Sequence, residues 1–204
     1  MTLGLIDINS VNLKSLKSAI EKLNINYKIC KKKEDFIDVS KLILPGVGAF
    51  PDFMYRLKKK NLIKIILEKC NNQIPFLGIC VGFQVIFSKS YEHKETLGFN
   101  LLEGSLVHLK EKNKKIKTPH VGWNNCKILK KSPLFEGIND NSDFYFDHSF
   151  YLQSKIKSAF LTKTNYDCEI ISSVSHNNIY GVQFHPEKSQ NNGLKCLKNF
   201  CEFC

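Results

Sequence analysis

The order of apolar segments in the first ninety residues constrains the fold more than any other feature of the sequence. Leu3 to Ile8 is predicted to form a short buried strand, and the apolar residues of 13–23 recur at helical spacings of three and four. Helical periodicity also flanks Asn61 on both sides. Further short strands are expected at 25–30, 42–44 and 75–79. Alternating strands and helices predict a parallel sheet with helices on both faces, whose active groups gather at the carboxyl ends of the strands.

The second half of the chain has a different pattern. Its short apolar segments are separated by turn residues, which predicts antiparallel hairpins. These strands are expected at 105–109, 125–129, 143–146, 160–164, 169–175 and 179–184, followed by a helix over 193–204. The 204 residues suit one domain, and we find no repeat or Pro-rich linker. We therefore predict a single α/β domain over 1–204, with a mostly parallel central sheet and additional antiparallel strands in the second half.

The charge of the chain invites a nucleic-acid partner, because 30 Lys and Arg oppose 19 Asp and Glu, for a net charge of +11. Only Arg56 is an arginine, whereas base recognition and phosphate clamps depend on the guanidinium group. The lysine runs at 31–33, 58–60 and 110–117 have no interleaved aromatics for base stacking. We therefore favour solvated lysines over nucleic-acid binding, which stays as an alternative.

Membrane and metal partners are not expected either. The apolar segments are shorter than the roughly 18–20 residues that cross a bilayer, and the first ten residues lack a basic region before an apolar stretch. A cytoplasmic protein is expected, with its eight cysteines reduced. Cys201 and Cys204 have CxxC spacing, but no second CxxC or histidine pair lies near them in the sequence to complete a zinc site. We expect no metal and no cofactor.

The segment Gly78-Ile79-Cys80-Val81-Gly82 has the pattern of a nucleophile elbow, with cysteine in the place of the usual serine. It follows a predicted strand and precedes a helical segment. The flanking glycines allow a close approach of the backbone, and the helix N-terminus would stabilise a thiolate. The amide of Val81 would point toward a developing oxyanion. The pentapeptide alone fits equally well a buried cysteine in a tight turn.

A base for such a thiolate is offered by the segment His185-Pro186-Glu187, at the end of the last predicted strand. Glu187 could turn back to accept the N–H of the imidazole and so fix its tautomer and orientation. In isolation the tripeptide fits a surface turn better. Together with a cysteine elbow it indicates a catalytic pair.

These motifs together resemble the class I glutamine amidotransferases, enzymes that hydrolyse glutamine to glutamate and ammonia and pass the ammonia to a synthase. The resemblance covers nearly the whole chain and implies a flavodoxin-like fold. It implies that Cys80 is the nucleophile, His185 the base and Glu187 the orienting carboxylate. It further implies that the segment 45–48 is the oxyanion strand, with Val47, Gly48 and Val81 supplying the oxyanion site.

The same resemblance implies a glutamine pocket. Gln84 and Glu92 are expected at the amino-acid end of the substrate, and the backbone of His148, Ser149 and Phe150 at its α-carboxylate. Gly46 is expected to bind substrate as well. The His148 side chain is expected to pack or orient its neighbours instead of acting as a second base.

Three further segments, 119–124, 145–150 and 185–189, are similar to those that mark the glutaminase subunits of imidazole glycerol phosphate synthase, a family of histidine biosynthesis. This resemblance implies that the partner in a heterodimer is a separate cyclase chain with a barrel fold. It implies that the partner interface contains Asn12, Trp123 and Lys188.

Two segments depart from the family pattern. The loop after the first strand usually contains glycines, whereas the sequence here is Asp7-Ile8-Asn9-Ser10-Val11-Asn12. Asn9 tolerates positive φ, but Val11 would do so only with strain. Asp147 replaces an apolar residue before His148. The altered loop leaves open a related role, in which the ammonia feeds an amidinating enzyme of surface-sugar synthesis.

Overall fold

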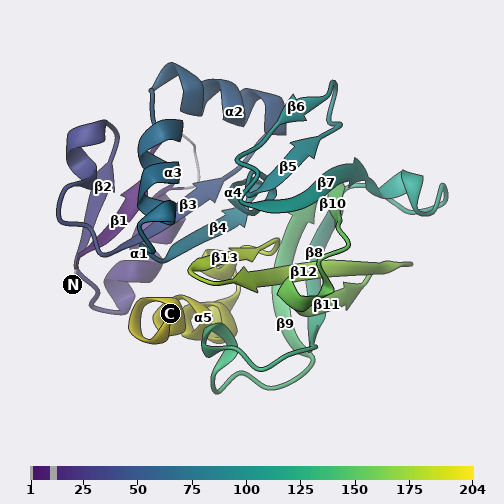
Figure 1. Cartoon of the computed structure of the whole chain (residues 1–204). Coiled ribbons are helices and arrows are strands. Elements are labelled where there is room, and N and C mark those ends of the chain that lie inside the picture. The colour runs from purple at the N-terminus through teal and green to yellow at the C-terminus, as the bar shows by residue number, and fades with distance from the viewer. Residues whose placement is uncertain (1, 10–12) are drawn as a thin grey trace.

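A nine-stranded sheet runs through the computed structural model, which describes residues 2–9 and 13–204 (Figure 1). Its strand order is β2-β1-β3-β4-β13-β12-β11-β8-β9. The first five of these strands pair in parallel. They are β1 (Leu3–Ile6), β2 (Tyr27–Cys30), β3 (Lys41–Gly46), β4 (Phe76–Cys80) and β13 (Ile179–Val182). The parallel sheet expected from the first half of the sequence is confirmed.

The rest of the large sheet is antiparallel, as the second half of the sequence predicts. Asn177 has a φ of 52° in the turn between β12 and β13, a conformation that asparagine tolerates. The antiparallel strands are β8 (His120–Ile128), β9 (Ser142–His148), β11 (Phe160–Asn165) and β12 (Glu169–His176).

A second sheet of four strands, in the order β10-β7-β5-β6, lies beside the first. The sequence predicts only part of one of these strands. The other three are short and carry polar residues such as Ser88 and Lys89, so they show no clear alternation. The strands are β5 (Phe87–Ser90), β6 (Thr96–Leu97), β7 (Leu102–His108) and β10 (Phe150–Gln153).

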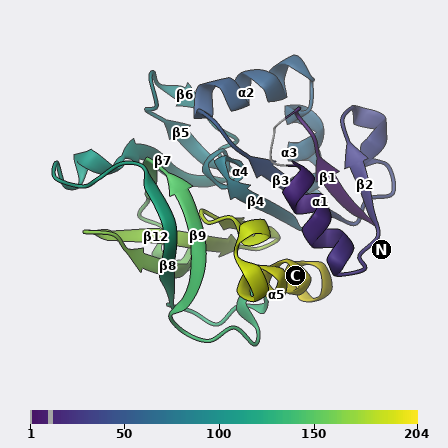
Figure 2. The same cartoon turned by 180° about the vertical axis from the view of Figure 1, so that it is seen from behind.

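Helices cover both faces of the parallel strands, with α1 and α5 on one face and α3 on the other (Figures 1 and 2). Asn61, at a φ of 55°, separates α2 from α3 as predicted. The α-helices are α1 (Leu13–Lys22), α2 (Phe50–Lys59), α3 (Ile63–Asn71), α4 (Val81–Gln84) and α5 (Gln190–Phe203). Single 3₁₀ turns are η1 (Lys33–Phe36), η2 (Leu109–Glu111), η3 (Pro133–Phe135), η4 (Lys157–Ala159) and η5 (Pro186–Lys188).

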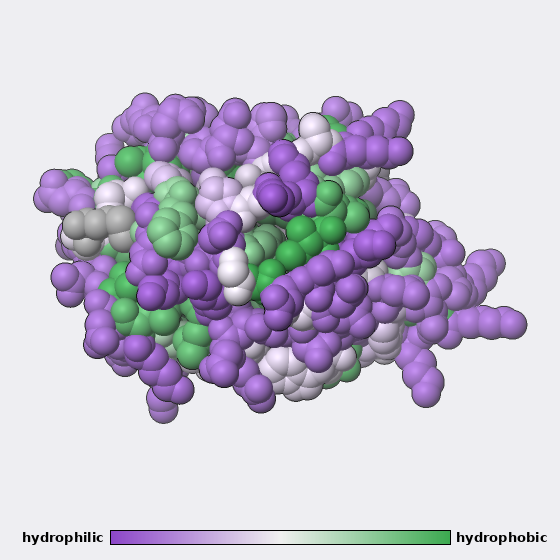
Figure 3. All heavy atoms as spheres, turned by 90° about the horizontal axis from the view of Figure 1, so that it is seen from below, coloured by the Kyte–Doolittle hydropathy of each residue, from purple (hydrophilic) through white to green (hydrophobic). Residues whose placement is uncertain are grey.

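The outer surface is largely hydrophilic on the face that Figure 3 presents, with smaller hydrophobic areas between the polar side chains. The lysines of the run 31–33 are all exposed. Within residues 2–9 and 13–204, no helix combines the length and the apolar character that a membrane span requires.

Lys41, at the start of β3, is a buried cation that closes the C-terminal end of α5. Its ammonium group donates to the carbonyl oxygens of Phe200 and Cys201, both at 2.9 Å, and to that of Cys204. Burial lowers the pKa of Lys41. These carbonyls are among the last of a helix, which have no partner within the helix itself. Lys41 therefore joins the first half of the sheet to the last helix.

Replacing Lys41 by Met should lower the free energy of unfolding by about 2 kcal/mol, because buried helix-end carbonyls lose a charged donor. Urea unfolding followed by circular dichroism measures the change. Lys198→Met is the matched control, since Lys198 lies on the surface of α5 and reaches Glu202 only at 3.7 Å. Its loss should cost at most about 0.5 kcal/mol. Equal losses in the two variants would contradict the role assigned to Lys41.

Candidate functional site

Cys80 lies at the last position of β4, and α4 begins at the next residue. Its φ of 56° and ψ of −108° lie outside the regions that residues with a side chain ordinarily adopt. Such strain persists only where the surrounding structure enforces it, and it is typical of active sites. The backbone therefore has the sharp strand-to-helix turn that the sequence predicts.

Close packing of backbone against backbone enforces this turn. A Cβ at Gly78 would lie 2.2 Å from the carbonyl oxygen of Gly82. A Cβ at Gly82 would lie 1.9 Å from the carbonyl oxygen of Leu44, in β3. Both distances are far below van der Waals contact, so both positions require glycine.

The loop after β3 lies beside the cysteine, because Gly46 and Cys80 are paired in the parallel register of β3 and β4. A Cβ at Gly46 would lie 2.6 Å from the amide nitrogen of Gly82, so Gly46 also packs against the turn. Gly48 has a φ of 93°, and a Cβ there would meet no atom within 4 Å. Val47 and Gly48 line the same cavity as the cysteine, and the space beside Gly48 is open.

His185 follows β13, the other parallel neighbour of β4, so its imidazole reaches the same edge of the sheet. Its Nδ1 lies 2.8 Å from Oε1 of Glu187, and both side chains are buried. The backbone amide of His185 donates to the carbonyl of Tyr145 at 2.8 Å. Phe184, the preceding residue, stacks on Phe144 with ring centroids 4.1 Å apart. The backbone hydrogen bond to β9 and the packing of Phe184 in the core therefore fix the position of the imidazole.

The electrostatics of His185 connect it to Cys80. Burial alone would lower the pKa of the imidazole, but a charge interaction and a hydrogen bond with Cys80, together with Glu187, outweigh burial and raise this pKa above its ordinary value. Because Nδ1 faces Glu187, the hydrogen bond to the sulfur falls to Nε2. His185 thus interacts with both Glu187 and Cys80, although 105 positions separate it from Cys80 in the sequence.

A cavity of about 280 Å³ opens onto Cys80 and His185. It brings together most of the residues that the sequence analysis assigns to the oxyanion site and the glutamine pocket. The lining residues are Val47, Gly48, Cys80, Val81, Gln84, Glu92, Pro119, Asp147, His148, Ser149, Phe150 and His185. Gly46 and Glu187 are not among these lining residues. Glu92 accepts a hydrogen bond from the amide of Phe50 at 2.7 Å, which holds its carboxylate at the start of α2.

The His148 side chain belongs to a directed chain of hydrogen bonds behind the cavity. Its Nδ1 lies 2.8 Å from the carbonyl oxygen of Phe150, so Nδ1 carries the proton. Its Nε2 must then accept from Nδ1 of His120 at 3.0 Å, and Nε2 of His120 accepts from the Asn124 amide at 3.2 Å. The orienting role expected for His148 thus has a structural partner, His120, that the sequence analysis did not identify.

Both of these imidazoles are held neutral. Burial lowers the pKa of His120 to about 3 and that of His148 to about 4, and the nearby imidazoles act in the same direction. His120 is stacked between Phe146 and Tyr166, with centroid distances of 4.6 and 4.0 Å. Neither imidazole therefore adds a positive charge to this side of the cavity at neutral pH.

Trp123 and Lys188 lie outside the cavity, on an exposed face of the β8–β9 hairpin. Trp123 is 49% exposed and its neighbour on the same face, Val121, is 52% exposed. The Trp123 ring meets Tyr145 edge-on with centroids 6.1 Å apart, and the ammonium of Lys188 lies 5.3 Å from the Tyr145 ring. We call Val121, Trp123, Tyr145 and Lys188 the hairpin face. Trp123 is not a core residue.

The first loop is described up to Asn9, whose φ of 64° agrees with the expectation for this residue. Arg56 donates to its carbonyl oxygen and Lys60 to its side-chain oxygen, both at 3.3 Å. Arg56 of α2 and Lys60 at the C-terminal cap of α2 thus both contact Asn9. Val11 and Asn12, which the sequence analysis also names, lie outside the described residues.

The sequence did not indicate a role in the site for Gln183, Pro119 or His120. Gln183 is fully buried and contacts Cys80. It lies beyond the end of β13, two residues before His185, and no local sequence pattern marks it. Asp147 was noted only as a departure, yet its carbonyl oxygen lies 3.7 Å from the sulfur of Cys80.

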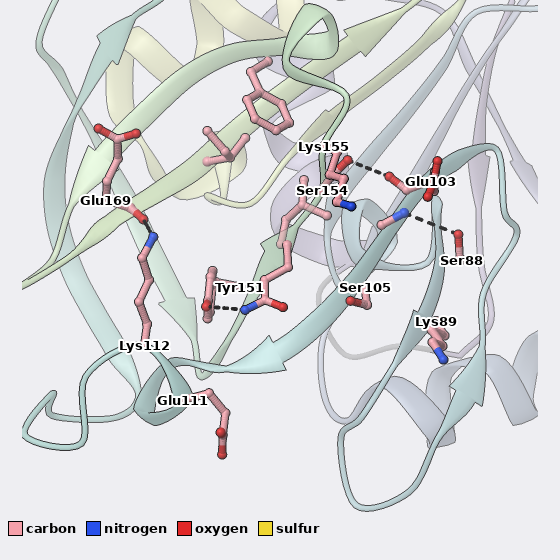
Figure 4. Close-up of a pocket in the computed structure, with 15 residues that line it drawn as sticks. Ser88, Lys89, Glu103, Ser105, Glu111, Lys112, Tyr151, Ser154, Lys155 and Glu169 are labelled. Carbon is pink, nitrogen blue, oxygen red and sulfur yellow. Dashed lines mark hydrogen bonds between the residues drawn. The ribbon is translucent and has the colours of Figure 1, made fainter.

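A larger cavity, of about 870 Å³, lies between the second sheet and β12 (Figure 4). Its rim carries Lys89, Lys112 and Lys155, and also Glu103, Glu111 and Glu169. Lys112 donates to the backbone carbonyl of Glu169 at 2.6 Å. These six charges cancel, and the described residues that line this cavity include no cysteine or histidine, so the smaller cavity is the candidate active site. In the described part of the chain, no group of three or more His, Cys, Asp or Glu side chains is arranged to hold a metal ion.

Comparison with known proteins agrees with this geometry. Residues 4–203 match the family described as glutamine amidotransferase class-I, so the chain belongs to that family. A relative from Methanocaldococcus jannaschii, named imidazole glycerol phosphate synthase subunit HisH, is 40% identical over 202 residues, which are 98% of each chain. The protein of the same name from Lactococcus lactis is 42% identical over 198 residues, or 97% of this chain and 96% of that one.

Solved structures share the fold at lower identity. PurLQS from Thermotoga maritima superposes with a TM-score of 0.79 at 16% identity, covering 99% of this chain and 98% of that one. A putative GMP synthase subunit from Thermoplasma acidophilum gives a TM-score of 0.75 at 19% identity, covering 98% and 92%. The expected flavodoxin-like α/β fold is confirmed.

The neutral histidines predict a loss of stability in acid. Each has a folded-state pKa below its unfolded value of about 6.5, so the unfolded chain binds more protons below that pH and stability falls as the pH falls. At pH 5 each neutral histidine lowers the free energy of unfolding by about 2 kcal/mol. His120→Phe keeps the stacked ring and removes one of the two titrations. Urea unfolding measures the free energy of unfolding at each pH. Between pH 7 and pH 5 this free energy should fall by about 2 kcal/mol less in the variant than in the wild type.

The control for this experiment is His176→Gln, which removes an exposed histidine. Its loss of stability between pH 7 and pH 5 should equal that of the wild type. If His120→Phe loses as much stability in acid as the wild type does, His120 is not held neutral by burial.

Proposed function

We propose that this chain is the glutaminase subunit of an imidazole glycerol phosphate synthase, which hydrolyses glutamine to glutamate and ammonia for a partner enzyme of histidine biosynthesis. The observation that carries the proposal is the interaction of His185 with both Cys80 and Glu187 at the edge of one cavity. Relatives named as HisH subunits, which align over nearly their whole length, support the choice of reaction and partner.

In this reaction the Cys80 thiolate attacks the side-chain amide carbon of glutamine. The carbonyl π electrons move onto the oxygen, and the tetrahedral intermediate then expels ammonia, which takes a proton from His185. The resulting thioester is cleaved by a water molecule that gives its proton back to His185. Glutamate leaves and the thiolate is restored. Glu187 keeps Nδ1 of His185 protonated, so that Nε2 handles each proton.

The oxyanion is stabilised by the amide of Val81 and by the peptide between Val47 and Gly48. Removal of one such donor typically raises a barrier by about 2.7–4 kcal/mol. The open space at Gly48 leaves this peptide free to turn. A partner that fixes the peptide with its N–H toward Cys80 would raise glutaminase activity by orders of magnitude, which couples hydrolysis to the synthase reaction.

Glutamine occupies the cavity with its amino-acid end toward Gln84 and Glu92. The Glu92 carboxylate suits the α-ammonium group, and the backbone of His148, Ser149 and Phe150 holds the α-carboxylate. Gly46 acts by its close packing against the turn. Because His148 is neutral and donates only to Phe150, it takes no proton from the substrate.

Ammonia is passed to a separate cyclase barrel docked on the hairpin face. Free ammonia is protonated in water, so an enclosed path between two chains is required for it to react. Trp123 and Lys188 anchor this interface, and Asn12 belongs to it by resemblance. A half-exposed tryptophan that rests on a second aromatic ring is typical of an interface hot spot.

The triad is tested by Cys80→Ala and Glu187→Gln, assayed as glutamate and ammonia release with the cognate cyclase and its substrate. Cys80→Ala should abolish the activity, since no nucleophile remains. Glu187→Gln should lower kcat by about 100-fold or more, because the imidazole loses its carboxylate partner. Undiminished activity in Cys80→Ala would overturn the proposal. Rescue of a histidine auxotroph by the wild-type gene separates this function from ammonia supply to a surface-sugar enzyme.

The interface is tested by Trp123→Ala, which should weaken binding of the cyclase by about 30-fold, or 2 kcal/mol. Isothermal titration calorimetry measures the Kd. The matched control is Phe203→Ala, another exposed aromatic, next to the end of α5 that Lys41 closes. Phe203 lies at the opposite end of β3 from Gly46, so the Phe203→Ala variant should leave the Kd unchanged. If both variants bind like the wild type, the hairpin face is not the docking surface.

A further inference from the structure

Gln183 is a fully buried amide that connects the substrate cavity to the nucleophile. It follows β13 directly and precedes His185 by two residues. Its Oε1 lies 3.1 Å from Nε2 of Gln84, and its Nε2 lies 3.8 Å from Sγ of Cys80. The cavity residue Gln84, the buried Gln183 and the sulfur are thus linked in series.

The direction of this series follows from hydrogen-bond chemistry. A thiolate has no proton and can only accept hydrogen bonds. If Cys80 is ionised, Gln183 must turn its NH₂ group to the sulfur and its oxygen to Gln84. Gln84 must then donate its NH₂ group to Gln183. Ionisation of Cys80 therefore fixes the orientation of both amides.

The other neighbours of the sulfur distinguish its two protonation states. The carbonyl oxygen of Asp147, at 3.7 Å, can accept from a thiol but offers nothing to a thiolate. Gln183 and His185 are donors, so they stabilise the thiolate. Hydrogen bonds to a charged group are stronger than those between neutral groups, so the donors favour ionisation.

Packing alone does not account for an amide at this position. A buried polar side chain costs free energy unless its hydrogen bonds are made, and an apolar side chain of the same size would avoid that cost. The flanking residues Val182 and Phe184 are apolar and equally buried. Among the described residues, the hydrogen-bond partners of the Gln183 side-chain amide are a cavity residue and the sulfur, which indicates a role in the reaction.

We propose that Gln183 is a positioning residue, which holds Cys80 in its thiolate form by donating its amide N–H to the sulfur while Gln84 fixes the orientation of that amide. The inference rests on the proposed function in so far as Cys80 is the nucleophile there. One consequence is that a substrate atom bound at Gln84 acts on the sulfur through a single intervening side chain.

The experiment measures the rate of alkylation of Cys80 by iodoacetamide between pH 5 and pH 10, read by mass spectrometry of the peptide that contains Cys80. Only the thiolate reacts, so the pH midpoint reports its ionisation. Gln183→Met keeps the length of the side chain and removes the donor. It should raise the midpoint by about one pH unit or more. Gln183→Glu should raise it further, because a carboxylate there repels the thiolate.

Gln84→Met should shift the midpoint in the same direction by less, since the donor stays but its orientation is free. Gln153→Met is the control, because Gln153 is exposed on the second sheet and bonds to Tyr151. It should leave the midpoint unchanged. Circular dichroism identifies folded variants. The midpoint of folded Gln183→Met decides the question, since a carboxylate at position 183 repels the thiolate whether or not the native amide donates to the sulfur.

An unchanged or lowered midpoint in folded Gln183→Met or Gln183→Glu would overturn the inference. The proposed function fails separately, if the wild type with its cyclase releases no ammonia from glutamine. In that case a raised midpoint in Gln183→Met would still establish that Gln183 stabilises the thiolate.

Discussion

The close approach of β3, β4 and the start of α4 is the constraint on which the rest of the site depends. Two glycines allow the backbone of Gly82 to contact Leu44, and the chain can make this turn only with Cys80 at positive φ. The strain at the cysteine is thus held by the packing of the sheet itself. The parallel neighbours of β4 then bring the peptide at Gly48 and the imidazole of His185 to the same edge.

Much of this arrangement could be predicted from the sequence, because its causes are local. The strand-to-helix turn at Cys80 is recognisable from its glycines, and the placement of His185 from the strand that precedes it. His120 and Gln183 could not be predicted in the same way. Each acts through a partner far away in the sequence, His148 in one case and Cys80 in the other. A buried polar side chain looks the same as any other until its partner is known.

The second sheet was missed for a different reason. Strands such as Phe87–Ser90 and Thr96–Leu97 are short and partly polar, and they are stabilised by pairing with β7 and not by their own pattern. The failure to predict the second sheet did not affect the prediction of the site. Of the residues in its strands, only Phe150 lines the candidate active site.

Three histidines near one cavity have opposite electrostatic environments. His185 faces a carboxylate and a sulfur, and its positive charge is favoured. His148 and His120 face a carbonyl, an amide and aromatic rings, and remain neutral. In the proposed reaction, one imidazole with a raised pKa is thus available for proton transfer, while its neighbours do not compete for the proton. The same residue type performs both tasks because only its surroundings differ.

The β8–β9 hairpin has a further consequence for how this protein can change in evolution. Its side chains alternate between the inner face, with His120 and His148, and the outer face, with Trp123 and Tyr145. Insertion of one residue into either strand would reverse this alternation beyond the insertion and send each remaining side chain to the wrong side. Insertions and deletions are therefore tolerated only in the connection between the two strands, 129–141, and not among the paired residues of β8 and β9.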